Sequence, residues 1–151
     1  MSTALTVLPA HAELGASAAS RWMACPGSVA LSRGQPDETS EHAQEGTAAH
    51  ALAEKCLTSG ANAATFLGMT IEGYRVTEEM ADAVQVYVDE CRKYIGPGYT
   101  YRIEQKFSLA KIAPPGPMFG TADFVSYDGV ARWLHVVDLK YGKGVVVEAA
   151  G

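Results

Sequence analysis

The sequence predicts an α+β fold in which helices come first and a mainly antiparallel sheet follows. Before residue 96, two long stretches repeat their apolar side chains with the period of a helix, and after Gly96-Pro97-Gly98 the period changes to two. The strand-like stretches are separated by turn residues and not by further helices, which is typical of an antiparallel meander. With 151 residues, the chain is long enough for one domain with a single core.

The N-terminal part predicts an irregular arm followed by short helices. Residues 1–16 show no periodicity, so we expect an arm there and a single domain over residues 17–151. Residues 17–34 have a helical pattern on both sides of Pro26, whose ring breaks or restarts a helix.

A long helix is predicted over residues 41–59. Thr39 and Ser40 are candidate N-caps, and Gly60 is placed to end the helix. Gly46 lies inside it and costs about 1 kcal/mol relative to alanine.

A second strong helix is predicted to begin after Thr77, an N-cap residue, and to end at Gly96. The segment before it, residues 61–76, has no clear pattern. An apolar stripe at helical spacing is interpreted as core. The stripe consists of Met80, Val84, Tyr87, Val88, Cys91 and Ile95.

The strands are predicted from alternation and turn residues. The expected elements are a strand at 99–107, a proline-rich loop at 111–118, a strand at 120–127, a two-residue turn at Asp128-Gly129, a strand at 131–141, a turn at 142–144 and the start of a fourth strand at 145–149.

Composition excludes several classes of protein. A net charge of -5 provides no overall basic field of the kind that marks many nucleic-acid-binding proteins. No run of about 20 apolar residues predicts a membrane helix, and no Lys or Arg precedes Arg21, which argues against a secretory signal. Three widely spaced cysteines form neither a zinc pattern nor a disulfide framework. We therefore expect a protein of the cytoplasm with free thiols.

The stretch "HVVDLKYGKG" places two charges in an apolar strand. Alternation puts Asp138 and Lys140 on one face, and Asp123 lies on the strand before. Counted from the expected turn, Asp123 and Asp138 are not equidistant, so their pairing requires a bulge or a longer loop. Two close carboxylates favour a divalent cation, and a nearby lysine can stabilise a phosphate undergoing attack. The alternative is a surface ion pair worth less than about 1 kcal/mol.

Two further side chains have the same ambiguity. His50 follows Glu45 and precedes Glu54 by about one helical turn each, and it is either a metal ligand or an ordinary packed or exposed histidine. Cys25, in "MACPGS", is either a cluster ligand or, as is commoner, a buried thiol.

Taken together, five motifs in order resemble the RecB-like branch of the PD-(D/E)xK nucleases. They are "SRWMACPGS", "EGTAAH", "IEQKF", "GTADF" and "VVDLKYGKG", and they span about residues 17 to 149. The resemblance is strongest to RecB-like proteins of phages and prophages, related to AddB and to CRISPR-associated RecB-like exonucleases. It implies a restriction-endonuclease-like αβββ core and a metal-dependent deoxyribonuclease of exonuclease type, encoded by a phage or prophage.

The resemblance also implies roles for particular residues. Asp123 and Asp138 would be acidic metal ligands, Lys140 the catalytic lysine, and His50 a further ligand of Mg²⁺ or Mn²⁺. Glu104 would be an auxiliary acid on the first core strand. The partner would be single-stranded DNA or duplex ends, and hydrolysis would proceed through a metal-activated water.

Two departures from the family pattern modify these expectations. The chain ends at Gly151, before the helix with a "QxxxY" motif that follows in the family. We therefore expect a core that is incomplete at its C-terminal end, with an exposed sheet edge through which two copies can pair. Cys25 matches the first cysteine of the iron–sulfur relatives, but no C-terminal triplet follows, so no cluster is expected. The alternative function is a catalytically incomplete nucleic-acid-binding or regulatory module that retains the nuclease core.

Overall fold

The computed structural model describes residues 14–15, 18–33, 41–108, 111 and 118–142. The chain divides into two compact units. Unit 1 comprises residues 1–36 and 106–121, and unit 2 comprises residues 37–105 and 122–151. Most of the expected arm at 1–16 lies outside the described residues.

The described part of unit 1 contains two short helices, α1 (Ala19–Ala24) and α2 (Gly27–Ser32), which contact each other. Pro26 is the N-cap of α2, where its missing N–H costs no helical hydrogen bond. The predicted break at Pro26 is therefore confirmed. The indole N–H of Trp22, within α1, donates a hydrogen bond of 3.0 Å to the carbonyl of Gly15, which precedes the helix.

The long helix α3 (Glu41–Ser59) occupies the predicted range. Gly60 follows it with a φ of 75°, a left-handed conformation that suits glycine at the end of a helix. The candidate caps Thr39 and Ser40 lie outside the described residues. Small and aliphatic residues in the middle of α3, such as Ala49 and Leu52, are fully buried.

The segment without a clear pattern forms a 3-10 helix, η2 (Ala63–Phe66), and a short antiparallel hairpin of β1 (Thr70–Ile71) and β2 (Tyr74–Arg75). Arg92 holds the chain ahead of η2. Its guanidinium donates hydrogen bonds to Asn62 Oδ1, to the carbonyl of Gly60 and to that of Ala61, at 2.7, 2.9 and 2.7 Å.

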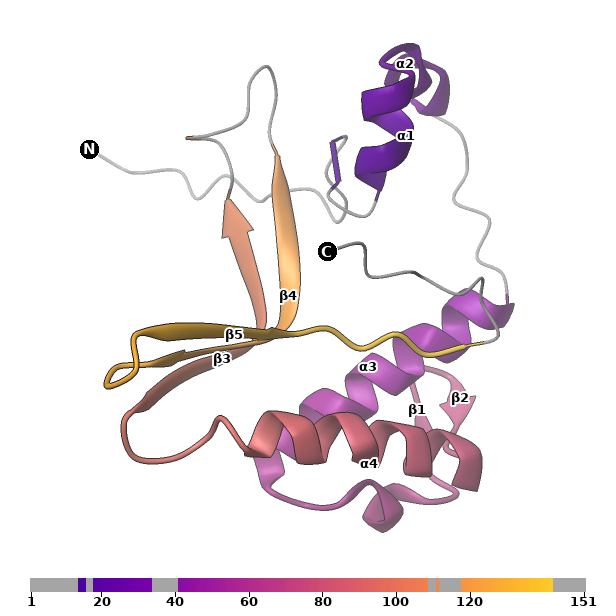
Figure 1. Ribbon diagram of the computed structural model, residues 1–151. Helices are drawn as coiled ribbons and strands as arrows, with labels where there is room; N and C mark the ends of the chain where they lie inside the picture. The colour runs from indigo at the N-terminus through magenta and orange to yellow at the C-terminus, as the bar shows by residue number, and fades with distance from the viewer. Residues whose placement is uncertain (1–13, 16–17, 34–40, 109–110, 112–117, 143–151) are drawn as a thin grey trace, which may run out of the picture. The chain divides into compact units, whose positions relative to one another are not determined.

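The second long helix, α4 (Glu78–Arg92), begins as predicted at Thr77, whose hydroxyl accepts a hydrogen bond of 3.2 Å from the N–H of Met80. The helix was predicted to reach Gly96, but it ends at Arg92 and continues as turns. The apolar stripe is buried apart from the partly buried Ile95. It packs against α3, beside which α4 lies in Figure 1.

The larger sheet consists of β3 (Tyr99–Ser108), β4 (Phe119–Asp128) and β5 (Trp133–Val137), in the order β3-β4-β5. It is antiparallel, so the α+β fold with helices before an antiparallel sheet is confirmed. Within unit 2, Phe124 of β4 is fully buried in the core with α3 and α4, and α4 contacts β5. The core therefore lies between the two long helices and one face of the sheet.

The connection between β4 and β5 differs from the predicted two-residue turn at Asp128-Gly129. Asp128 pairs with Trp133, which leaves a four-residue loop at 129–132. Asp128 Oδ1 accepts hydrogen bonds from the N–H groups of Val130 and Ala131, at 2.8 and 2.9 Å. The side chain of Asp128 thus provides an acceptor for two backbone N–H groups of the loop, as Asp often does in turns.

This longer loop sets the register that the site requires. Phe124 pairs with Val137, the last residue of β5, and extending this register by one position brings Asp138 opposite Asp123. The register therefore removes the offset that the sequence suggested.

The strand after the loop is shorter than the predicted range of 131–141, because β5 ends at Val137. The alternation nevertheless continues beyond it, since Asp138 and Lys140 are exposed while Leu139 is buried. Almost all of the expected loop at 111–118, the turn at 142–144 and the strand at 145–149 lie outside the described residues. In the described ranges, no helix is both long and apolar enough to cross a membrane.

Candidate metal centre

The helix α3 supplies His50. Its neighbours Ala48, Ala49 and Leu52 are fully buried and fix the helix against the core, whereas the His50 side chain is 33% exposed. The imidazole therefore lies at the border of the core, with its position set by a rigid helix.

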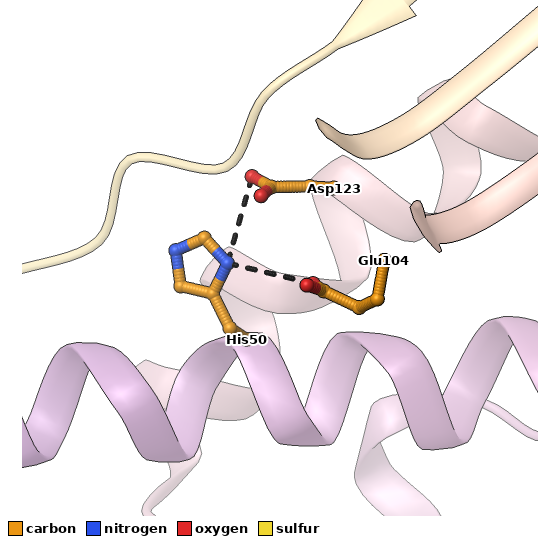
Figure 2. Close-up of side chains that lie close together, drawn as sticks. All are labelled: His50, Glu104 and Asp123. Atoms are coloured by element: carbon orange, nitrogen blue, oxygen red, sulfur yellow. Dashed lines mark ion pairs between the residues drawn. The ribbon is translucent and has the colours of Figure 1, made fainter. Parts of the chain in front are cut away.

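The first strand of the sheet supplies Glu104 through an unusual backbone conformation. Glu104 has a φ of 47°, a left-handed value that is uncommon for a residue other than glycine. Regular alternation is lost there, because Ile103, Glu104 and Gln105 are all partly buried. The conformation turns the Glu104 side chain toward α3, as Figure 2 shows.

The second strand supplies Asp123, one of the few polar residues of the described chain that are buried. Its side chain is 11% exposed. The backbone N–H of Leu139 donates a hydrogen bond of 2.7 Å to Asp123 Oδ2. This bond ties β4 to the segment that carries Asp138 and Lys140.

His50, Glu104 and Asp123 form a cluster in which one ligand atom from each lies within 4.8 Å of the others. His50 Nδ1 is 3.5 Å from Asp123 Oδ2 and 3.9 Å from Glu104 Oε1, and both carboxylates point toward the imidazole (Figure 2). All three residues belong to unit 2.

These separations fit a single divalent ion. Ligand atoms bound at about 2.1 Å to one octahedral ion lie about 3.0 Å apart when adjacent and about 4.2 Å apart when opposite. The distances from His50 Nδ1 to the two carboxylates, 3.5 and 3.9 Å, lie between these two values, so small shifts of the side chains would bring the three ligand atoms onto one ion. Carboxylate oxygens with one imidazole suit Mn²⁺, and the carboxylates also suit Mg²⁺. The cluster could thus hold a metal ion.

Asp138 and Lys140 lie beside this cluster and not within it. Of the residues that the structure describes, only the three above make up the group of candidate ligands. Lys140 Nζ pairs with Asp138 Oδ2 at 2.6 Å, and the two side chains are 69% and 52% exposed. In this structure, therefore, Asp138 holds the lysine and does not complete the cluster.

The family of this chain follows from comparison with known proteins. A family model described as "Protein of unknown function (DUF2800)" matches residues 11–151. The chain belongs to the DUF2800 family. No solved structure matches the chain. The description of the DUF2800 family assigns no activity, so the chemistry of the cluster must suggest one.

Electrostatics in this DUF2800 chain distinguish the two carboxylates. Burial raises the pKa of Glu104, and the nearby charge of Asp123 adds to the effect. Burial also acts to raise the pKa of Asp123, but hydrogen bonds from His50 and from the N–H of Leu139 outweigh it and lower that pKa. Asp123 is therefore the stronger acid, and the anion is the form that a metal ion binds.

The pKa of His50 is raised above its usual value of 6.5, chiefly by its hydrogen bond with Asp123, although burial acts in the opposite direction. The charges of Glu104 and Asp138 also raise it. Asp138 therefore affects the cluster electrostatically, as does Lys140, whose charge helps to lower the pKa of Asp123.

Two core residues of α4 lie within electrostatic range of the cluster. Burial raises the pKa of Tyr87 far above its usual value and that of Cys91 to about 11. The charge of Asp123 contributes to both shifts. The sequence indicated Tyr87 only as a core residue. An apolar stripe does not show which of its residues lie near a functional site.

Cys25 differs from its commoner interpretation as a buried thiol, because it is exposed, whereas Cys56 and Cys91 are buried. It lies between the two short helices α1 and α2. All three thiols are free.

Proposed function

We propose that this DUF2800 chain carries a metal-dependent DNA nuclease domain related to the RecB-like branch of the PD-(D/E)xK nucleases. One observation supports the proposal most. His50 from a helix and two carboxylates from successive strands converge within 4.8 Å, and the segment that follows presents Lys140 beside them. A role in a bacterial cytoplasm, with a phage or prophage origin, is the setting that this proposal implies.

Each residue has a role that its position supports. His50, Glu104 and Asp123 would hold Mn²⁺ or Mg²⁺, and the imidazole favours Mn²⁺. The ion would neutralise a phosphate oxygen and make water a better nucleophile at neutral pH. Lys140 would donate to an oxygen of the phosphodiester that gains charge during hydrolysis. Asp138 would orient the Lys140 ammonium, with which it pairs.

The test is DNA cleavage by the full chain. Single-stranded and duplex DNA are incubated with the protein and either Mg²⁺ or Mn²⁺, and products are resolved on a denaturing gel. We expect cleavage that requires the metal and that is lost in Asp123→Asn, Asp138→Ala and Lys140→Ala. Lys55→Ala and Asp82→Ala are matched controls, because both side chains are exposed and lie on helices outside the cluster.

The controls make the result decisive. Cleavage that persists in Asp138→Ala and Lys140→Ala would show that a contaminant or another site is responsible, and it would overturn the proposal. Cleavage that falls equally in the control variants would point to lost folding and not to lost chemistry.

A second candidate is a module that binds nucleic acid without cutting it and retains the nuclease core. The observation that favours it is the exposed Asp138–Lys140 pair, which lies outside the ligand group. It predicts that DNA is retained in a gel shift while no product forms with either metal.

A further inference from the structure

Charge is unevenly divided between the two units. Unit 1 contains four Lys or Arg residues and one Asp or Glu, a formal charge of +3, whereas unit 2 contains eight and sixteen, a formal charge of -8. The net charge of -5 for the whole chain therefore conceals a basic unit and a strongly acidic one.

This division bears on how a nuclease of this kind could hold its substrate. Unit 2 contains the candidate metal centre, and its acidic charge repels the phosphates of nucleic acid at distances up to about a Debye length. A divalent ion would offset two of those charges only locally. Affinity for a polyanion must therefore come from elsewhere in the chain.

The described part of unit 1 has the side chains for this task. Its charged residues are all basic, namely Arg21, Arg33, Lys106 and Lys111, and all four side chains are exposed. They come from α1, from the end of α2, from β3 and from the segment after β3. A unit whose described charges are all positive attracts the phosphate backbone of nucleic acid.

Aromatic side chains accompany these cations. Lys106 Nζ lies 4.9 Å from the centre of the Phe119 ring, and its neighbour Phe107 is 43% exposed. The Phe119 ring is buried, so of these two rings the exposed Phe107 is the one that can stack on an unpaired base. This combination favours DNA over a bilayer surface, for which the two six-residue helices of unit 1 offer little amphipathic area.

We propose that unit 1 is the DNA-binding unit of the chain and that its four basic side chains contact the phosphate backbone. The inference rests on the proposed nuclease function for its choice of partner. Binding would be independent of sequence and sensitive to salt, because contacts to phosphate carry no base information.

The experiment measures binding without cleavage. The full chain is titrated into a fluorescein-labelled duplex and a labelled single strand in the presence of EDTA, and anisotropy is followed at several salt concentrations. The test variant combines Arg21→Gln, Arg33→Gln, Lys106→Gln and Lys111→Gln.

A matched control variant removes four positive charges from unit 2. It combines Lys55→Gln, Arg75→Gln, Arg102→Gln and Arg132→Gln, whose side chains are all exposed. A third variant keeps the charges of unit 1 by exchanging Lys for Arg and Arg for Lys at its four positions. Circular dichroism establishes that each variant is folded.

We expect the test variant to bind DNA at least about tenfold more weakly and to reduce the slope of log K against log salt by up to about 3 to 4. The control and the charge-preserving variants should bind as the unaltered chain does. Equal losses of DNA affinity in the test and control variants would show that only the net charge of the chain matters, and this result would overturn the inference. So would undiminished binding by the test variant or no DNA binding by the unaltered chain.

Vesicles that contain phosphatidylserine provide the remaining comparison. If the test variant loses affinity for vesicles and keeps its affinity for DNA, the basic unit serves a membrane and the inference fails. EDTA prevents metal-dependent cleavage, so this experiment measures binding alone. A negative result here is therefore distinguishable from failure of the nuclease proposal, which the cleavage experiment tests separately.

Discussion

The N–H of Leu139 donates a hydrogen bond of 2.7 Å to Asp123 Oδ2, the same oxygen that lies 3.5 Å from His50 Nδ1. One carboxylate thus connects a strand, a helix and the segment that carries Lys140. Asp123 therefore has a structural task in addition to any task as a metal ligand, and the two can be separated by mutation.

Replacement of Asp123 by Asn and by Ala should have different effects. Asn keeps an acceptor for the N–H of Leu139 but is a weaker ligand than a carboxylate, so calorimetric titration with Mn²⁺ should show affinity reduced by about tenfold or more. Ala should lower Mn²⁺ affinity in the same way and should also lower the free energy of unfolding by about 1–2 kcal/mol, because a buried donor loses its partner. Equal stability of the two variants in urea would contradict the structural task.

The stability of the metal-free protein and its affinity for Mn²⁺ should change with pH in opposite directions. The pKa of His50 is raised in the folded state from 6.5, so its contribution to stability is fully present below about pH 6.5 and is lost as pH rises through the folded pKa. Metal binding requires the neutral imidazole, so Mn²⁺ affinity should rise over that same interval. His50→Gln should remove the part of both pH dependences that comes from this histidine, as measured by urea unfolding and Mn²⁺ titration from pH 5 to 9.

Replacement of Gly46 by Ala should stabilise the protein. Gly46 lies within α3, and a Cβ there would lie 3.8 Å from the carbonyl oxygen of Tyr141, an ordinary contact. The helix propensity of Ala should therefore raise the free energy of unfolding by up to about 1 kcal/mol. Gly46→Leu is the control, because a larger side chain would push against Tyr141 and cancel the gain. A lower melting temperature for the Ala variant would contradict this account.

In a strand, Ala usually gives a more stable protein than Gly does, but at position 104 we expect the opposite. At a φ of 47°, a side chain with a Cβ costs about 1–2 kcal/mol that glycine avoids. We expect the Gly variant to be more stable than the Ala variant by about 1 kcal/mol, and both to bind Mn²⁺ more weakly than the unaltered chain. Thermal unfolding and calorimetry measure the two effects. A more stable Ala variant would show that the left-handed conformation depends on the glutamate.

Replacement of Arg92 by Ala should destabilise the junction after α3. The guanidinium binds Asn62 and the carbonyls of Gly60 and Ala61 and is only 31% exposed. We expect a loss of about 1–2 kcal/mol in the free energy of unfolding. Lys93→Ala is the matched control, since Lys93 makes an exposed ion pair with Glu90 that should contribute little. Equal effects in the two variants would argue against the junction as the cause.

Local signals were sufficient to predict the long helices and the order of the strands. Thr77 as a cap, Gly60 as a helix end and the apolar stripe of α4 depend on short-range chemistry that is visible in the sequence. The length of the loop after Asp128 was not predictable, because Asp-Gly favours a two-residue turn and the side-chain bonds of Asp128 override that preference.

The sequence named all three residues of the cluster as candidates, but it did not show which of the candidate residues lie together. His50 and Asp123 came together with Glu104, which the sequence indicated only as an auxiliary acid. The left-handed conformation that aims Glu104 at His50 depends on the surrounding fold and has no sequence signal. Asp138 was expected to join the cluster, but it pairs with Lys140 instead, which is the surface ion pair that their alternation along the strand also allowed.

The loop at 129–132 has a consequence for how the protein tolerates insertions. A surface loop between two strands is ordinarily a place where a residue can be added at little cost. Here its length determines which residue faces Asp123 five positions away along β4. A single inserted residue would shift the strand that follows by one position and turn Asp138 and Lys140 toward the opposite face. The length of the loop at one end of the hairpin thus determines which side chains lie together at the other end.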